Sequence, residues 1–147
     1  MRLGTLAAQL DELLGVATYE GVDGALDGIQ VGRPDDPIER VGLAVDAAEA
    51  TIAAAADADV DALIVHHGLF WGDRAPLEGV TLARVRALVS AEIALYAAHL
   101  PLDGHPTVGN AAGLARTLGL TDTAPFGTIA GVTIGRGVPI QREVRRV

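Results

Sequence analysis

The chain has 147 residues, of which 50% are hydrophobic, and a formal net charge of -8. This length and composition suit one folded domain with its own core. The acidic balance and the lack of a basic patch argue against nucleic acid or an anionic membrane as a partner. Because the chain has no cysteine, disulfides, thiolate metal sites and cysteine nucleophiles are excluded.

Leucines at helical spacing predict a helix over residues 5–14, near the start of the chain. Acidic residues interrupt its apolar positions, which argues against a signal peptide. No segment approaches the ~20 consecutive apolar residues that a membrane span requires. We therefore expect a soluble, cytoplasmic protein. The Gly- and Asp-rich passage that follows, over 21–37, predicts turns with one short strand within GIQVG (28–32).

Strands and helices then alternate along the chain. The predicted elements are a strand over 41–45, a helix over 46–57, a strand over 62–65, a helix over 81–91, a strand ending near His99, a helix over 111–119 and one last strand within 127–138. Asp46 is expected to cap its helix, because Glu49 follows at the spacing of a capping box. Asn110 is expected to cap the helix that follows it.

This order of elements predicts the fold class. Apolar strands without alternation are buried on both faces, as in parallel sheets that helices cover. We therefore expect an α/β fold, with a mostly parallel sheet and helices on both faces, in a single domain over 1–147. Right-handed crossovers would place the carboxyl ends of the three strands on one edge of the sheet.

The four histidines of the chain cluster around these strand ends. His66 and His67 end one predicted strand, His99 ends the next, and Asp103 and His105 follow within six residues. Ligands of open parallel sheets bind beyond the carboxyl ends of the strands. Imidazole and carboxylate groups are the usual ligands of Zn²⁺, Mn²⁺, Fe²⁺ or Ni²⁺ where thiolates are absent. The sequence therefore predicts a metal site formed by these residues.

Alternatives stay open at this point. The adjacent histidines could bind one ion each or converge on neighbouring ions, and Asp103 could bridge a pair of metals. His105 lies between Gly104 and Pro106 and is expected to be exposed rather than a ligand. Trp71 could line a pocket beside the histidines or pack beneath the loop. In the simplest structural interpretation, the histidines merely cap strand ends.

Three segments resemble one family. LDGIQVG (26–32), LIVHHGLFW (63–71) and YAAHLPLDGHPTVGNAAGLARTLGL (96–120) are similar to the NIF3-like, dinuclear-metal-centre family, whose members are often labelled GTP cyclohydrolase I type 2 homologues. The resemblance implies a two-metal site in an α/β fold and a toroidal homohexamer. It implies that His66 and His67 are metal ligands and that Asp103 lies between the ions. His99 matches a histidine close to the centre, where it would transfer protons.

The chain departs from the family pattern after about residue 120. Longer members complete the site with a histidine and a glutamate four residues apart near the C-terminus. Here no histidine follows His105, and Glu143 has no histidine four residues before it. The C-terminal part of the family's metal site is therefore expected to be absent, so that one or two divalent ions per chain would be held by fewer ligands, unless another chain supplies them.

Two functions follow from this interpretation. The leading hypothesis is a metal-dependent hydrolase that acts on a nucleotide or related small molecule, with His66, His67 and Asp103 as ligands and His99 as the proton-transfer group. The alternative is a non-enzymatic metal carrier or an oligomeric assembly protein, because an incomplete site would exchange its metal readily.

Overall fold

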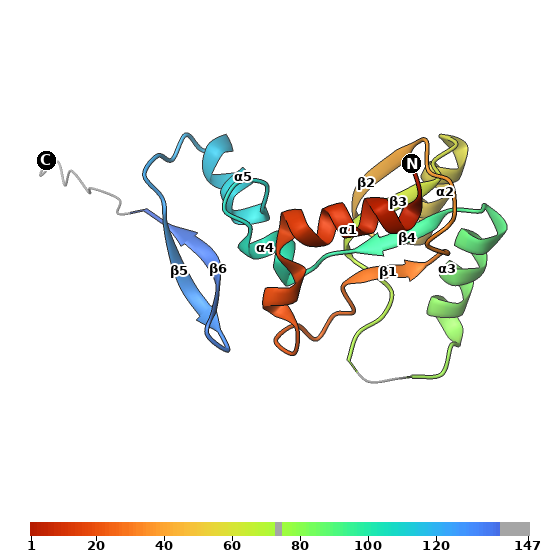
Figure 1. The fold of residues 1–147 in the computed structure, drawn as a ribbon, viewed down its shortest axis with the longest axis horizontal. Helices are drawn as coiled ribbons and strands as arrows, with labels where there is room; N and C mark the ends of the chain where they lie inside the picture. Colours follow the sequence, from red (N-terminus) through yellow and green to blue (C-terminus); the bar gives the residue numbers. More distant parts are fainter. Residues whose placement is uncertain (73–74, 139–147) are drawn as a thin grey trace, which may run out of the picture.

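The computed structural model describes residues 1–72 and 75–138 and has the expected α/β architecture (Figure 1). Its main sheet has four strands in the order β1-β4-β3-β2, in which β2, β3 and β4 are parallel and β1 is antiparallel to β4. The strands are β1 (Gly28–Val31), β2 (Val41–Asp46), β3 (Ala62–His67) and β4 (Ala94–Ala97). The predicted mostly parallel sheet is therefore confirmed.

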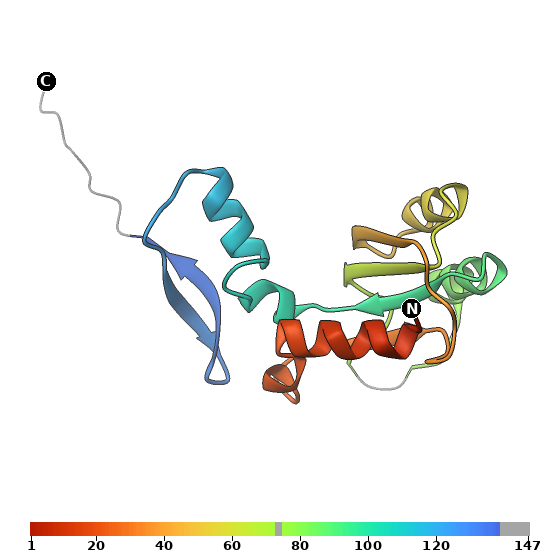
Figure 2. The same cartoon turned by 45° about the horizontal axis from the view of Figure 1, so that its top comes forward.

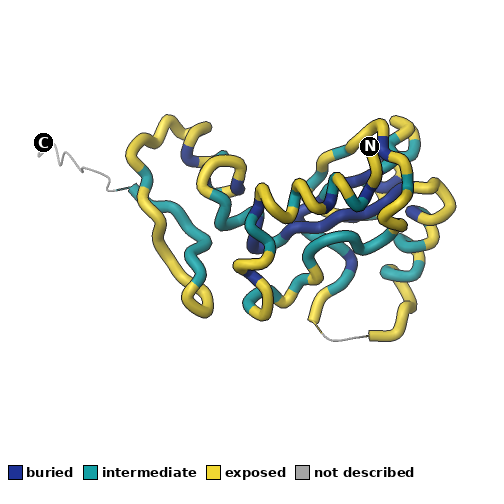
Figure 3. Tube along the Cα trace, in the orientation of Figure 1, coloured by how far each residue is buried: buried dark blue, intermediate teal, exposed yellow. Residues whose placement is uncertain are grey.

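Helices cover both faces of this sheet (Figure 2). Even-numbered residues of β3 and β4 pack with α1 (Leu3–Leu14), and odd-numbered residues pack with α2 (Glu49–Asp57) and α3 (Gly79–Ser90). The two central strands are buried on both faces, as Figure 3 shows. This explains why their sequences are continuously apolar, because successive side chains point to opposite faces and both faces are covered.

The predicted capping role of Asp46 is wrong. Asp46 is the last residue of β2, where it pairs with His67 of β3, and α2 begins only at Glu49 with Ala48 as its N-cap. The Asp46 carboxylate binds the His67 ring and is therefore not available to a helix terminus. Asn110 is likewise not a cap, because it is the first residue of its helix and Gly109 precedes it as the N-cap.

The C-terminal part of the described chain also differs from the prediction. The expected loop after His99 contains α4 (Leu100–Gly104), and α5 (Asn110–Thr117) follows. The single expected strand is a hairpin of β5 (Ala124–Ile129) and β6 (Val132–Gly137). Its two turn residues, Ala130 and Gly131, both have positive φ angles, of 47° and 86°, as a tight hairpin turn requires. Figure 1 shows this hairpin beyond α4, away from the main sheet.

Gly15, with a φ of 64°, ends α1, and the short helix η1 (Val16–Tyr19) follows. Within residues 1–72 and 75–138, no helix has the length and apolar character needed to cross a membrane. Glu143 lies outside the described residues.

Candidate metal centre

Three histidines meet at the carboxyl edge of the main sheet. His66 and His67 are the last two residues of β3, and His99 follows β4 by two residues. One nitrogen from each ring lies within 4.8 Å of a nitrogen from the others. The ring centroid of His66 lies 4.3 Å from that of His67 and 4.9 Å from that of His99. The adjacent strands therefore bring these three side chains together, as the topology predicted.

The Nδ1 atom of each of these three rings contacts an oxygen atom. His66 contacts the backbone oxygen of Ala98 at 3.2 Å, His67 contacts Asp46 Oδ1 at 2.6 Å, and His99 contacts Asp23 Oδ1 at 2.9 Å. Carbonyl and carboxylate oxygens only accept hydrogen bonds, so each Nδ1 must donate. In the neutral ring, Nε2 then keeps its lone pair. All three histidines are thus set in the tautomer that binds a metal through Nε2.

This donor set fits a divalent cation. Histidines that bind metals almost always donate their other ring N–H to a carboxylate or carbonyl, which fixes the ring and increases its basicity. Ligand atoms about 2.0–2.2 Å from one ion lie at most about 4.4 Å apart. The three ring nitrogens lie within 4.8 Å of one another, an upper bound close to that limit. This separation is compatible with ligands of one ion or of two neighbouring ions.

Asp103 lies beside this group, near the end of α4. Its Oδ1 is 3.7 Å from Nε2 of His66, which is too long for a hydrogen bond, and it accepts one from the Asn110 side chain at 2.8 Å. The carboxylate therefore faces the free nitrogen of His66. The structure places the predicted ligands His66, His67 and Asp103 in one neighbourhood, together with His99, as expected from the strand order.

His105 does not join the group. Among the described residues, the cluster able to hold a metal contains only His66, His67 and His99. The Nδ1 of His105 instead accepts the backbone N–H groups of Thr107 and Val108, at 3.2 and 3.1 Å. It orders the loop between α4 and α5. The expectation that His105 is not one of the ligands agrees with this arrangement.

Two aspartates of the Gly- and Asp-rich passage support His99. Asp23 accepts hydrogen bonds from the His99 ring and from the backbone N–H groups of Ala25 and Leu100, and Asp27 accepts the His99 backbone N–H. Burial opposes ionisation of Asp23, but these hydrogen bonds outweigh it and lower the pKa of its carboxyl group. Burial raises the pKa of Asp27, and the neighbouring charge of Asp23 adds to the effect.

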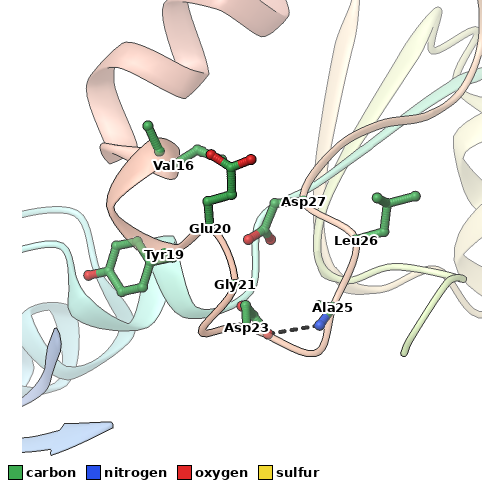
Figure 4. Close-up of a pocket in the computed structure, with 9 residues that line it drawn as sticks. Val16, Tyr19, Glu20, Gly21, Asp23, Ala25, Leu26 and Asp27 are labelled. Carbon is green, nitrogen blue, oxygen red and sulfur yellow. Dashed lines mark hydrogen bonds between the residues drawn. The ribbon is translucent and has the colours of Figure 1, made fainter. Parts of the chain in front are cut away.

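A cavity of about 320 Å³ lies behind these two aspartates (Figure 4). Its lining includes Tyr19 and Glu20 together with Asp23 and Asp27, and excludes the three histidines. Burial raises the pKa of the Tyr19 hydroxyl, with a further contribution from the charge of Asp103. The two aspartates therefore separate this cavity from His99.

The turn that follows the histidine pair is clamped by Gln30 of β1. Its Oε1 accepts the Leu69 backbone N–H at 2.6 Å, and its Nε2 donates to the Leu26 backbone oxygen at 2.6 Å. A Cβ atom at position 68 would lie 2.4 Å from Gln30 Nε2, so any side chain there would displace the Gln30 amide from these contacts. Gln30 thus fixes the backbone directly after His67.

Replacing Gln30 with alanine should therefore weaken metal binding by about 10-fold, because the Leu69 N–H loses its acceptor and the turn loosens. Isothermal titration with Zn²⁺ measures the change. Gln9→Ala, at an exposed position of α1, is the matched control. Equal affinities of the Gln30→Ala variant and the parent protein would contradict the clamp.

Trp71 lies next to the histidines rather than beneath the loop. Its side chain is edge-on to His99, with ring centroids 4.7 Å apart, and 6.1 Å from His67. Its indole N–H donates to the Gly68 backbone oxygen at 3.3 Å, and the residue is 47% exposed. Trp71 is the only tryptophan of the chain, so its fluorescence reports directly on this site.

The sequence prediction missed the groups that orient the rings. Asp46 was interpreted as a helix cap, and Asp23, Asp27 and Gln30 lay in a passage interpreted mainly as turns. One signal was available for Asp46, which ends a strand beside that of His67 and therefore reaches the same sheet edge. No spacing in the sequence connects Asp23 with His99, because 76 residues separate them.

These features define an α/β protein with a candidate metal-binding histidine cluster at the carboxyl edge of a parallel sheet. The family model for Duf34/NIF3 (NGG1p interacting factor 3) matches residues 1–145, and the chain belongs to this family. The resemblance seen in the sequence is therefore confirmed.

Relatives and solved structures agree with this assignment. The chain is 47% identical over 135 residues to a GTP cyclohydrolase 1 type 2 homolog of Halobacterium salinarum, covering 92% of this chain and 53% of that protein. It is 48% identical over 130 residues to the homolog of Treponema pallidum, covering 88% and 46%. The crystal structure of TTHA1606 from Thermus thermophilus superposes with a TM-score of 0.80 at 45% identity, covering 90% and 53%. The chain spans about half the length of the relatives it matches.

Proposed function

We propose that this protein binds a divalent metal ion through His66, His67 and Asp103 and hydrolyses a nucleotide or a related small molecule. The observation that carries the proposal is the pattern of Nδ1 contacts, because all three clustered rings keep Nε2 free. Histidines that bind metals almost always show this arrangement. The curated relatives are named as homologs of a cyclohydrolase, which supports hydrolysis as the reaction type.

The residues of this chain have distinct roles in the proposal. When bound, Zn²⁺, Mn²⁺, Fe²⁺ or Ni²⁺, as one or two ions per chain, supplies positive charge and Lewis acidity. Asp46 and the Ala98 carbonyl hold the two β3 rings in place. His99, whose ring is oriented by Asp23, carries a proton to or from the substrate. Asp103 supplies an anionic ligand from α4.

Turnover in the presence of each of these metals, measured with nucleoside triphosphates and phosphate esters, tests the proposed reaction. We expect activity that falls at least about 100-fold in Asp103→Ala, because both charge and a ligand are lost. Asp35→Ala, in an exposed turn, should leave activity unchanged. His99→Ala should keep its metal and lose turnover; loss of the metal in this variant would instead make His99 a ligand. Turnover that persists in Asp103→Ala would refute the proposed site.

Metal delivery without catalysis is the second candidate. It is favoured by the composition of the proposed ligand set, in which two imidazoles and one carboxylate, from His66, His67 and Asp103, would leave an ion with open positions. Such a site exchanges its metal readily. Reversible metal uptake without turnover on any substrate would support this role. The dinuclear centre and the hexamer implied by the family resemblance stay predictions.

A further inference from the structure

Trp71 is an exposed aromatic residue at the edge of the candidate metal centre. Its ring centroid lies 4.7 Å from that of His99 and 6.1 Å from that of His67, and the residue is 47% exposed. Tryptophan is highly buried on average in folded proteins, because the indole has a large apolar surface. Among the described residues, the only other exposed aromatic residue is Phe126 of β5. The exposure of this indole therefore coincides with the proposed ligand site.

The position of this side chain is fixed by its neighbours. Trp71 forms an antiparallel bridge with Ala25, and the Gly72 N–H donates to the Gly24 backbone oxygen at 2.6 Å. The indole N–H donates to the Gly68 backbone oxygen at 3.3 Å. The bridging passage is flanked by the two aspartates that accept hydrogen bonds from His99, so the indole and that histidine are held by one segment. Little freedom is therefore lost when a ligand contacts the indole, which favours binding.

The indole keeps at least one face free of the histidine that lies nearest to it. The planes of Trp71 and His99 meet at 74°, which is an edge-to-face arrangement and occupies at most one face of the indole. Small-molecule sites are lined mainly by apolar and aromatic side chains, with a few polar groups that fix the orientation of the ligand. Aromatic rings pair with such a face by offset stacking. The free face of Trp71 beside the histidines is therefore suited to a flat ring.

We propose that Trp71 is a specificity-determining residue, which stacks on a planar heteroaromatic ring of the ligand, as a nucleobase has. The inference rests on the proposed function for the place of the ligand, beside His66, His67 and Asp103. It adds to that function the part of the ligand that is recognised. A cationic group could also contact an indole face, but a divalent ion at the adjacent histidines would repel it. A neutral ring carries no such penalty.

Stacking on one indole recognises a ring without selecting a particular base, because every base has a π face. We therefore expect the four common nucleoside monophosphates to bind the Zn²⁺-loaded chain at least about tenfold more tightly than ribose 5-phosphate, which carries the same phosphate without a base. Titration calorimetry measures both affinities. Because Trp71 is the only tryptophan of the chain, a base stacked on it should also quench the protein fluorescence, and ribose 5-phosphate should not.

Substitutions at this position separate stacking from bulk. Trp71→Leu keeps an apolar side chain and removes the ring, so it should weaken nucleotide binding at least about fivefold and leave the affinities for ribose 5-phosphate and Zn²⁺ unchanged. Trp71→Phe keeps a smaller ring and should stay within about threefold of the parent chain. Phe126→Leu is the matched control, since it removes an aromatic ring that is 63% exposed on β5.

Several results would overturn this inference. They are the absence of binding by all four nucleotides, equal affinities for nucleotides and ribose 5-phosphate, and unchanged nucleotide binding in Trp71→Leu. Loss of Zn²⁺ in Trp71→Leu would also overturn it, because the indole would then support the ion rather than the ligand. The outcome is independent of the reaction: ring-dependent binding without turnover would refute the hydrolase alone, and turnover without a preference for the ring would refute the stacking role alone.

Discussion

Replacing both His66 and His67 with alanine is expected to abolish stoichiometric metal binding, with a loss of affinity of more than about 100-fold. Substitution of groups that merely orient a metal ligand already costs about 10–100-fold, and this variant removes two ligands themselves. The Ala98 backbone oxygen and the Asp46 carboxylate would then lose the ring N–H groups that donate to them. The metal content of purified protein, measured by mass spectrometry after loading with Zn²⁺, gives the result.

The single tryptophan provides an independent measurement. Because Trp71 lies 4.7 Å from His99 and 6.1 Å from His67 between ring centroids, a paramagnetic ion such as Ni²⁺ at this site should quench its fluorescence. The double variant should show no saturable quenching. His105→Ala is the matched control, since this histidine lies outside the cluster and should leave the quenching curve unchanged. Equal metal content in the double variant and the parent chain would exclude the proposed centre.

Replacing Asp23 with alanine should lower the free energy of unfolding by roughly 2–4 kcal/mol and also lower turnover. The Asp23 side chain is 4% exposed and accepts hydrogen bonds from the His99 ring and from the Ala25 and Leu100 backbone N–H groups. All three donors would lose their acceptor together. His99 would also lose the contact that fixes its tautomer. Chemical denaturation and the turnover assay measure the two effects.

The same carboxylate predicts a pH dependence. Hydrogen bonds hold the pKa of Asp23 below its usual range, so its charged form is favoured by folding. Its contribution to stability is therefore complete above the unfolded-state pKa of about 3.9 and is lost as the pH falls through the lower pKa of the folded state. The stability difference between the parent chain and Asp23→Asn should shrink over that acidic interval. Asp35→Asn, in an exposed turn, should show no such convergence. A difference that is constant across the interval would contradict the role of the charge.

The sequence was sufficient for the fold class and for the histidine pair. The apolar runs before His66 and His99, separated by helical segments, predict parallel strands whose ends meet at one edge. The local pattern did not show whether Asp46 ends a strand or caps the helix that follows. An aspartate a few residues before a helix is compatible with either position. The same limit applies to the hairpin, where a turn at Ala130 and Gly131 divides what the sequence showed as one alternating run.

The tertiary structure alone decided how the rings are oriented. Asp23 reaches His99 across 76 residues, and Gln30 reaches Leu69 across 39. These contacts arise because β1 runs antiparallel beside β4, so β1 and the passage that precedes it begin at the carboxyl edge of the parallel strands. Hydrophobic periodicity determines which elements form and which of their faces are buried. Which donor meets which acceptor is set by the packing of distant segments, and periodicity carries no information about that.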